Sequence, residues 1–136
     1  MRIVILRSTP VNPDSRVEKE ANSLVKGGHS VIILGWERET GAVDTETEIC
    51  LSDSKVKIMR FAESATFGGG MLNIKPELKI HVKMKRWLIS HRNDYDAIHS
   101  CDFDMAIVGY SIAKKYKKKL VYDIFDYYTE AHYIPG

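Results

Sequence analysis

The chain has 136 residues, of which 44% are hydrophobic and 28% are charged, and its formal net charge is +2. This length fits one domain, and the composition excludes a chain that is disordered over most of its length. The net charge is too small to indicate nucleic-acid binding by itself. We therefore treat residues 1–136 as one folded domain and expect no nucleic-acid partner.

The cysteines and the N-terminus indicate in which cellular compartment the protein is expected. Cys50 and Cys101 lie far apart without C-x-x-C spacing, which favours reduced thiols over a disulfide framework or a zinc site. The N-terminal apolar run is too short for a signal peptide, and no run approaches the ~18 apolar residues of a membrane span. We predict a cytoplasmic protein that binds no metal.

The chain begins with a strand and a helix. Ile3 to Leu6 is a continuous apolar run, typical of a strand buried on both faces. The loop from Ser8 to Ser15 contains two prolines. Asp14 or Ser15 can cap the helix that follows, and Gly27–Gly28 is expected to end it.

Two further strands are predicted before the middle of the chain. Val31 to Leu34 indicates a second buried strand, with Gly35 and Trp36 just past its end. Residues 37–54 are acidic and lack periodicity, so we expect a surface excursion there. Val56 to Phe61 predicts a third strand.

The second half continues the alternation. Pro76 suits the first residue of a helix reaching about Arg92, although LKIHVKM (78–84) also alternates as a strand would. A short strand at Ala97–His99, a helix at Phe103–Tyr116 and a strand at Leu120–Ile124 follow. Strands that alternate with helices predict an α/β Rossmann-like three-layer domain with a mostly parallel sheet of about five strands.

Polar and aromatic residues gather where the last two strands end. These segments are YDAIHSCDFD (Tyr95 to Asp104) and KLVYDIFDYYTE (Lys119 to Glu130). In an open parallel sheet, ligands bind in the crevice at the carboxyl ends of the strands. We therefore expect one wall of a polar-ligand site at this edge.

Three segments resemble family-4 glycosyltransferases. The run DSRVEKEANSLVKGGHSVIILGW (Asp14 to Trp36) is similar to the family's R-V-x-x-E-A-x-x-L-x-x-x-G-H-x-V helix and next strand. YDAIHSCDFD resembles its D-x-I-H-A-H-D-x-D strand end, and KKLVYDIFDYYTE its K-x-V-Y-D-x-H-E-x-x-x-E segment. The matches keep chain order and cover about 1–36 and 94–132.

The resemblance implies the N-terminal, acceptor-side half of a GT-B fold. The full enzyme would transfer a sugar from a nucleotide sugar to an acceptor, with retention of configuration and without catalytic metal. We expect residues 1–136 to be truncated before the donor-binding C-terminal domain and inactive alone. A UDP- or GDP-linked sugar would bind that missing domain, and the acceptor would be a glycan or a lipid-linked glycan in polysaccharide biosynthesis.

The first candidate sites lie in the loop after the first strand. Asn12, Asp14 and Arg16 stand where a cleft-facing loop is expected. Backbone N–H groups at the helix start can bind an anion, and Arg16 can pair with a phosphate or carboxylate. A capped turn with Arg16 on the surface is the alternative. The loop has no glycine for close approach of a pyrophosphate, which argues against a dinucleotide site.

The remaining candidates follow from the two later motifs. By resemblance, the acceptor- or sugar-binding residues are His99, Cys101, Asp102, Asp123, Phe125, Asp126 and Glu130. Cys101 and Phe125 stand where relatives carry histidine. His99 can instead be a core histidine and Asp102 a helix N-cap. Aromatic residues can stack on sugar faces or pack against another domain. No catalytic residue is assigned.

A basic helix suggests a membrane surface. Basic and aromatic residues accumulate between 75 and 92, and the membrane candidates are Lys79, Lys83, Lys85, Arg86 and Trp87. This pattern suits peripheral contact with anionic headgroups at the inner membrane surface. A solvated face beside a core stripe is the alternative.

A second function class also fits the sequence. A stand-alone, non-catalytic Rossmann-like module that binds a glycan or a partner protein would account for both departures from histidine. Acceptor binding can be tested directly in either case.

Overall fold

The computed structural model describes residues 1–11, 14–51, 55–64 and 74–123. In this part of the chain six strands form one sheet in the order β3-β4-β2-β1-β5-β6. The strands are β1 (Arg2–Leu6), β2 (Ser30–Glu37), β3 (Thr45–Cys50), β4 (Lys55–Ala62), β5 (Ala97–Cys101) and β6 (Lys119–Asp123). Only the β3–β4 pair is antiparallel among them.

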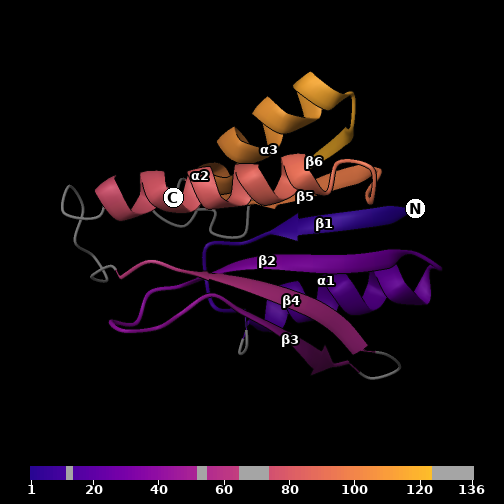
Figure 1. Ribbon diagram of the computed structural model, residues 1–136. Helices are drawn as coiled ribbons and strands as arrows, with labels where there is room; N and C mark the ends of the chain where they lie inside the picture. The colour runs from indigo at the N-terminus through magenta and orange to yellow at the C-terminus, as the bar shows by residue number, and fades with distance from the viewer. Residues whose placement is uncertain (12–13, 52–54, 65–73, 124–136) are drawn as a thin grey trace, which may run out of the picture.

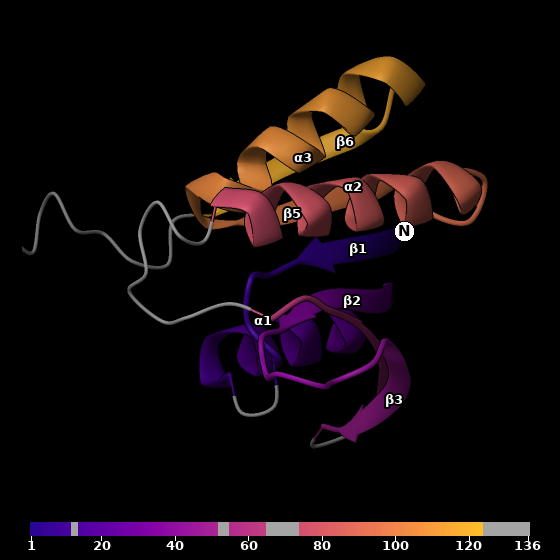
Figure 2. The same ribbon diagram turned by 60° about the vertical axis from the view of Figure 1, so that its left-hand side comes forward.

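Three helices cover the sheet on both faces. They are α1 (Ser15–Lys26), α2 (Ile74–Ser90) and α3 (Asp102–Tyr116). Helix α1 lies on one face, whereas α2 and α3 lie side by side on the other (Figures 1 and 2). This arrangement confirms the predicted α/β Rossmann-like fold with a mostly parallel sheet.

The strands divide the core into two parts. In β1, Val4 and Leu6 pack on the side of α2 and α3, whereas Ile5 packs on the side of α1. All three side chains are at most 1% exposed. Because both faces of β1 are buried, its sequence is a continuous apolar run instead of an alternating one.

Residues 78–84, for which the sequence allowed a helix or a strand, are helical and belong to α2. Ile80, Met84 and Leu88 are four residues apart and fully buried against the sheet, as one helical face requires. Pro76 falls in the first turn of the helix, where its missing N–H leaves no intrahelical bond unmade. The helix ends at Ser90, two residues before the predicted end.

Gly109 lets α3 approach β5 closely. A Cβ atom at this position would lie 2.1 Å from Ser100 Oγ and 3.1 Å from Leu120 Cδ1. Since Asp102 is the first residue of α3, this close packing also fixes where Asp102 stands above the sheet.

Three sequence predictions about the strands were wrong. Residues 45–50 form the edge strand β3, although only Ile49 in this strand is buried. A strand exposed on both faces has no hydrophobic alternation, so pairing with β4 defines it. Strand β2 includes Gly35 and Trp36, and β5 extends to Cys101, because the parallel ladders continue past the apolar residues.

Candidate functional site

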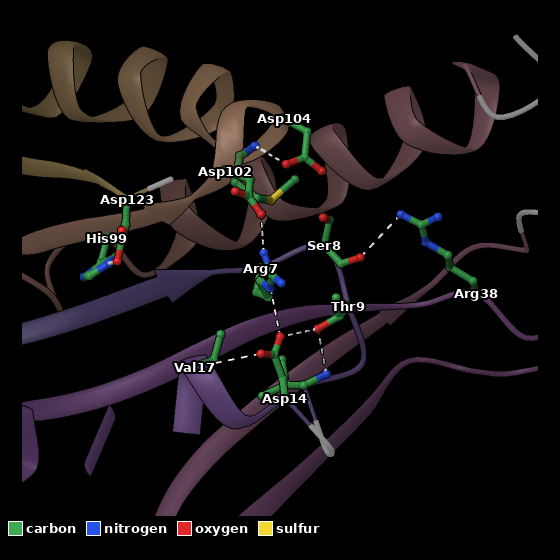
Figure 3. A network of polar contacts seen from close by, with 12 residues as sticks. Arg7, Ser8, Thr9, Asp14, Val17, Arg38, His99, Asp102, Asp104 and Asp123 are labelled. Carbon is green, nitrogen blue, oxygen red and sulfur yellow. Dashed lines mark hydrogen bonds and ion pairs between the residues drawn. The ribbon is translucent and has the colours of Figure 1, made fainter. Parts of the chain in front are cut away.

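The candidate site lies at the carboxyl edge of the parallel strands. There the chain leaves β1 into a loop that leads to α1, and β5 passes directly into α3. Figure 3 shows two groups of polar side chains at this edge. One group surrounds Arg7, and the other contains His99 and Asp123.

The first group, the Arg7 cluster, consists of Arg7, Thr9, Asp14 and Asp102. Arg7 Nε donates to Asp14 Oδ2 at 2.8 Å, and Arg7 Nη1 donates to Asp102 Oδ2. Thr9 Oγ1 donates to the same Asp14 oxygen at 2.9 Å. The three charged side chains are only 9–19% exposed.

Two carboxylates stabilise the charge of Arg7 in the Arg7 cluster. Burial by itself would lower the pKa of Arg7, but its hydrogen bonds to Asp14 and Asp102 and their charges raise the pKa above the ordinary value. Asp14 also accepts from Val17 N at 3.5 Å and so caps α1, as the sequence predicted. This cluster joins the loop after β1 to the starts of α1 and α3.

The loop after β1 is held from below by β2 and β4. Trp36 N donates to Thr9 O at 2.9 Å, and Arg60 Nε donates to Pro10 O at 2.6 Å. A Cβ atom at Gly35 would lie 2.7 Å from Thr9 O, so glycine permits this contact. Val11 is buried in the left-handed region at φ 75°, which is strained for a β-branched residue. The loop backbone is therefore tightly constrained where the structure describes it.

Arg38 covers the same loop from the end of β2. Its guanidinium lies 4.0 Å from the centre of the Trp36 ring, and its Nη2 donates to Ser8 O at 3.4 Å. Burial lowers the pKa of Arg38, while the charges of Asp104 and Glu77 oppose that shift. These contacts fix the loop further.

The second group, the His99 cluster, consists of Glu20, His99, Cys101 and Asp123. His99 Nε2 lies 3.0 Å from Glu20 Oε2 and 3.4 Å from Asp123 Oδ2. Cys101 pairs in register with Asp123 and is two residues from His99, so all three side chains face α1. Glu20 comes from α1 and meets them from the other side.

The two carboxylates of the His99 cluster have opposite pKa shifts. Burial, followed by the hydrogen bond to Asp123 and the charge of Asp123, raises the pKa of Glu20 to about 8. The same hydrogen bond lowers the pKa of Asp123 against the effect of burial, and His99 lowers it further. Near neutral pH, Glu20 is therefore the protonated partner and Asp123 the ionised one.

Cys101 is not activated as a nucleophile in this setting. Its side chain is fully buried, and burial together with the charge of Glu20 raises the pKa of its thiol far above the ordinary value. A thiol with a raised pKa stays protonated and unreactive.

Two open hollows lie beside the His99 cluster. One, of about 290 Å³, is lined by Arg16, Lys19, Glu20 and Asp123. The other, of about 320 Å³, continues along α1 to Ser23, Leu24 and His99. Cations beside carboxylates suit a ligand that carries both an anionic group and hydroxyls.

The structure brings most of the predicted site residues to one edge. Asp14, His99, Asp102 and Asp123 lie there (Figure 3). Arg16, at the start of α1, and Cys101, at the end of β5, belong to the same edge. The N-cap interpretation of Asp102 was wrong, because Cys101 is the N-cap of α3, and the side chain of Cys101 makes no capping hydrogen bond. Asp102 binds Arg7 instead. Asn12, Phe125, Asp126 and Glu130 lie outside the described residues.

The predicted membrane-contact residues all lie on α2 but differ in exposure and in their contacts. Lys83 pairs with Asp44 at 3.2 Å and Glu63 at 3.4 Å, and Trp87 stacks on His91 with ring centres 4.0 Å apart. Lys79 and Arg86 are exposed, whereas Lys85 is partly buried. A separate apolar stripe faces outward: Ile74, Leu78 and Val82 are 47–59% exposed.

Sequence reasoning missed two central residues, Arg7 and Glu20. Each had a local signal. Arg7 is a charged residue directly after a buried strand, and Glu20 lies three residues after Val17 and four before Leu24, within the apolar stripe of α1. A charge in either position requires a buried partner, but the sequence does not say which one.

Comparison with protein-family models and with curated proteins finds no match for this sequence. Solved structures do resemble it. A structure of trehalose-6-phosphate synthase OtsA from E. coli, bound with UDP-2-fluoro glucose, has a TM-score of 0.62 and 14% identity over 90% of this chain. Sucrose-phosphate synthase from Thermosynechococcus elongatus has a TM-score of 0.63 and 12% identity over 91%.

The chain has the Rossmann-like fold found in GT-B glycosyltransferases. A structure of OtsA without ligand resembles it as well, with a TM-score of 0.57 and 13% identity over 91% of this chain. The chain spans 32% of the first OtsA chain, 33% of the second and 63% of the sucrose-phosphate synthase chain. At these identities the likeness establishes the fold and leaves the activity open.

Proposed function

We propose that this chain is the acceptor-binding half of a retaining, family-4-like glycosyltransferase. The observation that carries the proposal is the gathering of Asp14, Arg16, His99, Asp102 and Asp123 at one sheet edge. These residues come from three separate motifs of the sequence. The likeness of the fold to GT-B glycosyltransferases supports it.

Different residues at this edge bind different chemical groups of the acceptor. Arg16 and Lys19 line the hollow and can pair with a phosphate or carboxylate of the acceptor. Asp123, whose pKa is lowered, accepts hydrogen bonds from sugar hydroxyls. The Arg7 cluster fixes the loop that forms the neighbouring wall. The nucleotide sugar would bind a donor domain facing this edge.

The proposal is tested on the protein that contains this domain together with its donor domain. Nucleotide release is measured with UDP- and GDP-linked sugars and a panel of glycan and lipid-linked acceptors. Arg16→Ala should raise the acceptor KM by roughly tenfold, the loss of one charge-assisted contact. Arg2→Ala, at the opposite edge of the sheet, should leave it unchanged. Acceptor binding without any nucleotide release would favour the non-catalytic module instead.

We propose further that α2 contacts an anionic membrane surface. No described helix is both long and apolar enough to cross a membrane. The exposed stripe of Ile74, Leu78 and Val82 lies on the same helix as the exposed Lys79 and Arg86. Such a helix can lie in the interface with its apolar stripe inserted between headgroups.

Sedimentation with phosphatidylglycerol vesicles tests this contact. Leu78→Glu should abolish co-sedimentation, whereas Val43→Glu, the same change at another exposed position, should not. Pure phosphatidylcholine vesicles should bind weakly, because they lack the negative surface charge. Equal loss in both variants, or none in either, would contradict the role of α2.

A further inference from the structure

We propose that Glu20, His99 and Cys101 bind one Zn²⁺ ion between α1 and the end of β5. This departs from the sequence prediction of no metal. It does not rest on the proposed function, because metal binding is measured without sugar or nucleotide.

The spacing of the donor atoms fits a single ion. Zn²⁺ binds nitrogen, oxygen and sulfur at about 2.0–2.3 Å, so tetrahedral ligand atoms lie roughly 3.3–3.8 Å from one another. His99 Nε2 is 3.0 Å from Glu20 Oε2 and 3.4 Å from Asp123 Oδ2. Donor atoms of Glu20, His99 and Cys101 all lie within 4.8 Å of one another. Side-chain movements of about 1 Å would bring these three donor atoms to tetrahedral spacing, and a water molecule would be the fourth ligand.

Hydrogen bonds alone do not satisfy this group. One ring N–H can donate to one acceptor well, yet His99 Nε2 faces two carboxylate oxygens. Glu20 Oε2 is buried and has no hydrogen-bond partner among the described residues. A dication between Glu20, His99 and Cys101 would contact all three donor atoms at once.

The ligand types select the metal. Cysteine, histidine and carboxylate together suit Zn²⁺, whereas Mg²⁺ and Ca²⁺ prefer oxygen ligands alone. Binding would deprotonate the buried Cys101 thiol and release its proton. The ligands come from α1 and β5, so the ion would tie the helix to the sheet.

The test uses the 136-residue chain with Zn²⁺ and Co²⁺ as probes. Zn²⁺ affinity is measured by competition with a chromogenic chelator, and Co²⁺ reports on the ligands through its visible and near-ultraviolet absorption. We expect one ion per chain, a thiolate-to-cobalt charge-transfer band, and a higher Tm with Zn²⁺, since the ion binds only the folded state.

Cys101→Ser should remove the charge-transfer band and lower Zn²⁺ affinity on the order of 100-fold. Cys50→Ser, which removes the other free thiol, should change neither. Glu20→Gln and His99→Gln, checked for folding by circular dichroism, should also weaken binding. The proposal would be overturned if the wild type did not bind Zn²⁺ stoichiometrically. It would also be overturned if the charge-transfer band disappeared in Cys50→Ser but persisted in Cys101→Ser.

Discussion

The Arg7 cluster and the His99 cluster occupy the same edge of the sheet but differ in charge balance. In the Arg7 cluster, one guanidinium with several fixed donors is placed between two carboxylates. In the His99 cluster, a single imidazole nitrogen faces two carboxylates beside a buried thiol. In the first group every charged side chain is paired, whereas in the second Glu20 Oε2 has no hydrogen-bond partner among the described residues.

This difference separates a structural role from a ligand-binding role. The Arg7 cluster connects the loop after β1 to α1 and α3, so its role is to stabilise the fold. The His99 cluster borders both hollows and has unmet bonding capacity, which a ligand can fill. Mutations should therefore affect stability in the first cluster and binding in the second.

The largest effect should follow removal of the Arg7 charge. Arg7→Met leaves Asp14 and Asp102 facing each other at low exposure without their cation, and we expect a loss of about 3 kcal/mol in the free energy of unfolding. Urea denaturation measures it. Arg2→Met breaks a pair whose side chains are 52% and 43% exposed, and should cost far less because solvent screens exposed ion pairs. Equal losses would remove the distinction between the two ion pairs.

A smaller loss should follow from displacing α3. Gly109→Ala places a methyl group against Ser100 Oγ, and overpacking of this kind costs about 1–3 kcal/mol. Ser100 Oγ is buried without a hydrogen-bond partner among the described residues, so Ser100→Ala should recover part of the loss in the double variant. Thermal denaturation of the three variants tests this coupling, and strict additivity would contradict it.

The His99 cluster should reveal itself through the pH dependence of the free energy of unfolding. The pKa of Glu20 is about 8 in the folded chain against an ordinary 4.5, so between these values the folded state holds a proton that the unfolded state has lost. Its contribution is complete below pH 4.5 and is lost as pH rises through 8. Asp123 acts oppositely: its lowered pKa gives stability that is lost in acid.

Unfolding in urea between pH 5 and pH 9, with a chelator present, measures the Glu20 contribution. Wild-type stability should decline with rising pH relative to Glu20→Gln, which cannot titrate. Parallel pH profiles for the two proteins would show that Glu20 has an ordinary pKa.

The sequence predicted most of the fold because most of it is locally encoded. Buried apolar runs marked β1, β2 and β4, and Asp14 with Gly27–Gly28 marked the ends of α1. Strand β3 escaped because TETEIC has one buried side chain, and only its partner strand defines it.

The position of the candidate site could be predicted from the sequence, but the pairing of its side chains could not. The motifs and strand ends predicted that His99 and Asp123 lie at the carboxyl edge of the sheet, and the structure has His99 in β5 and Asp123 at the end of β6. The pairing of Arg7 with Asp102 spans 95 residues, and that of Glu20 with His99 depends on how α1 crosses the sheet. Such partners follow from topology, which a single sequence specifies only indirectly.

Chemical-shift mapping of the isotope-labelled chain tests directly whether a ligand binds at the carboxyl edge of the parallel strands. A hexose phosphate is the probe, because it combines hydroxyls with an anion. We expect shift changes at the amides of Arg16, Glu20, His99 and Asp123, with those of Arg2 and Asp96 at the opposite edge unchanged. Changes centred on the opposite edge, or none at millimolar probe, would contradict the assignment of this edge as the ligand site.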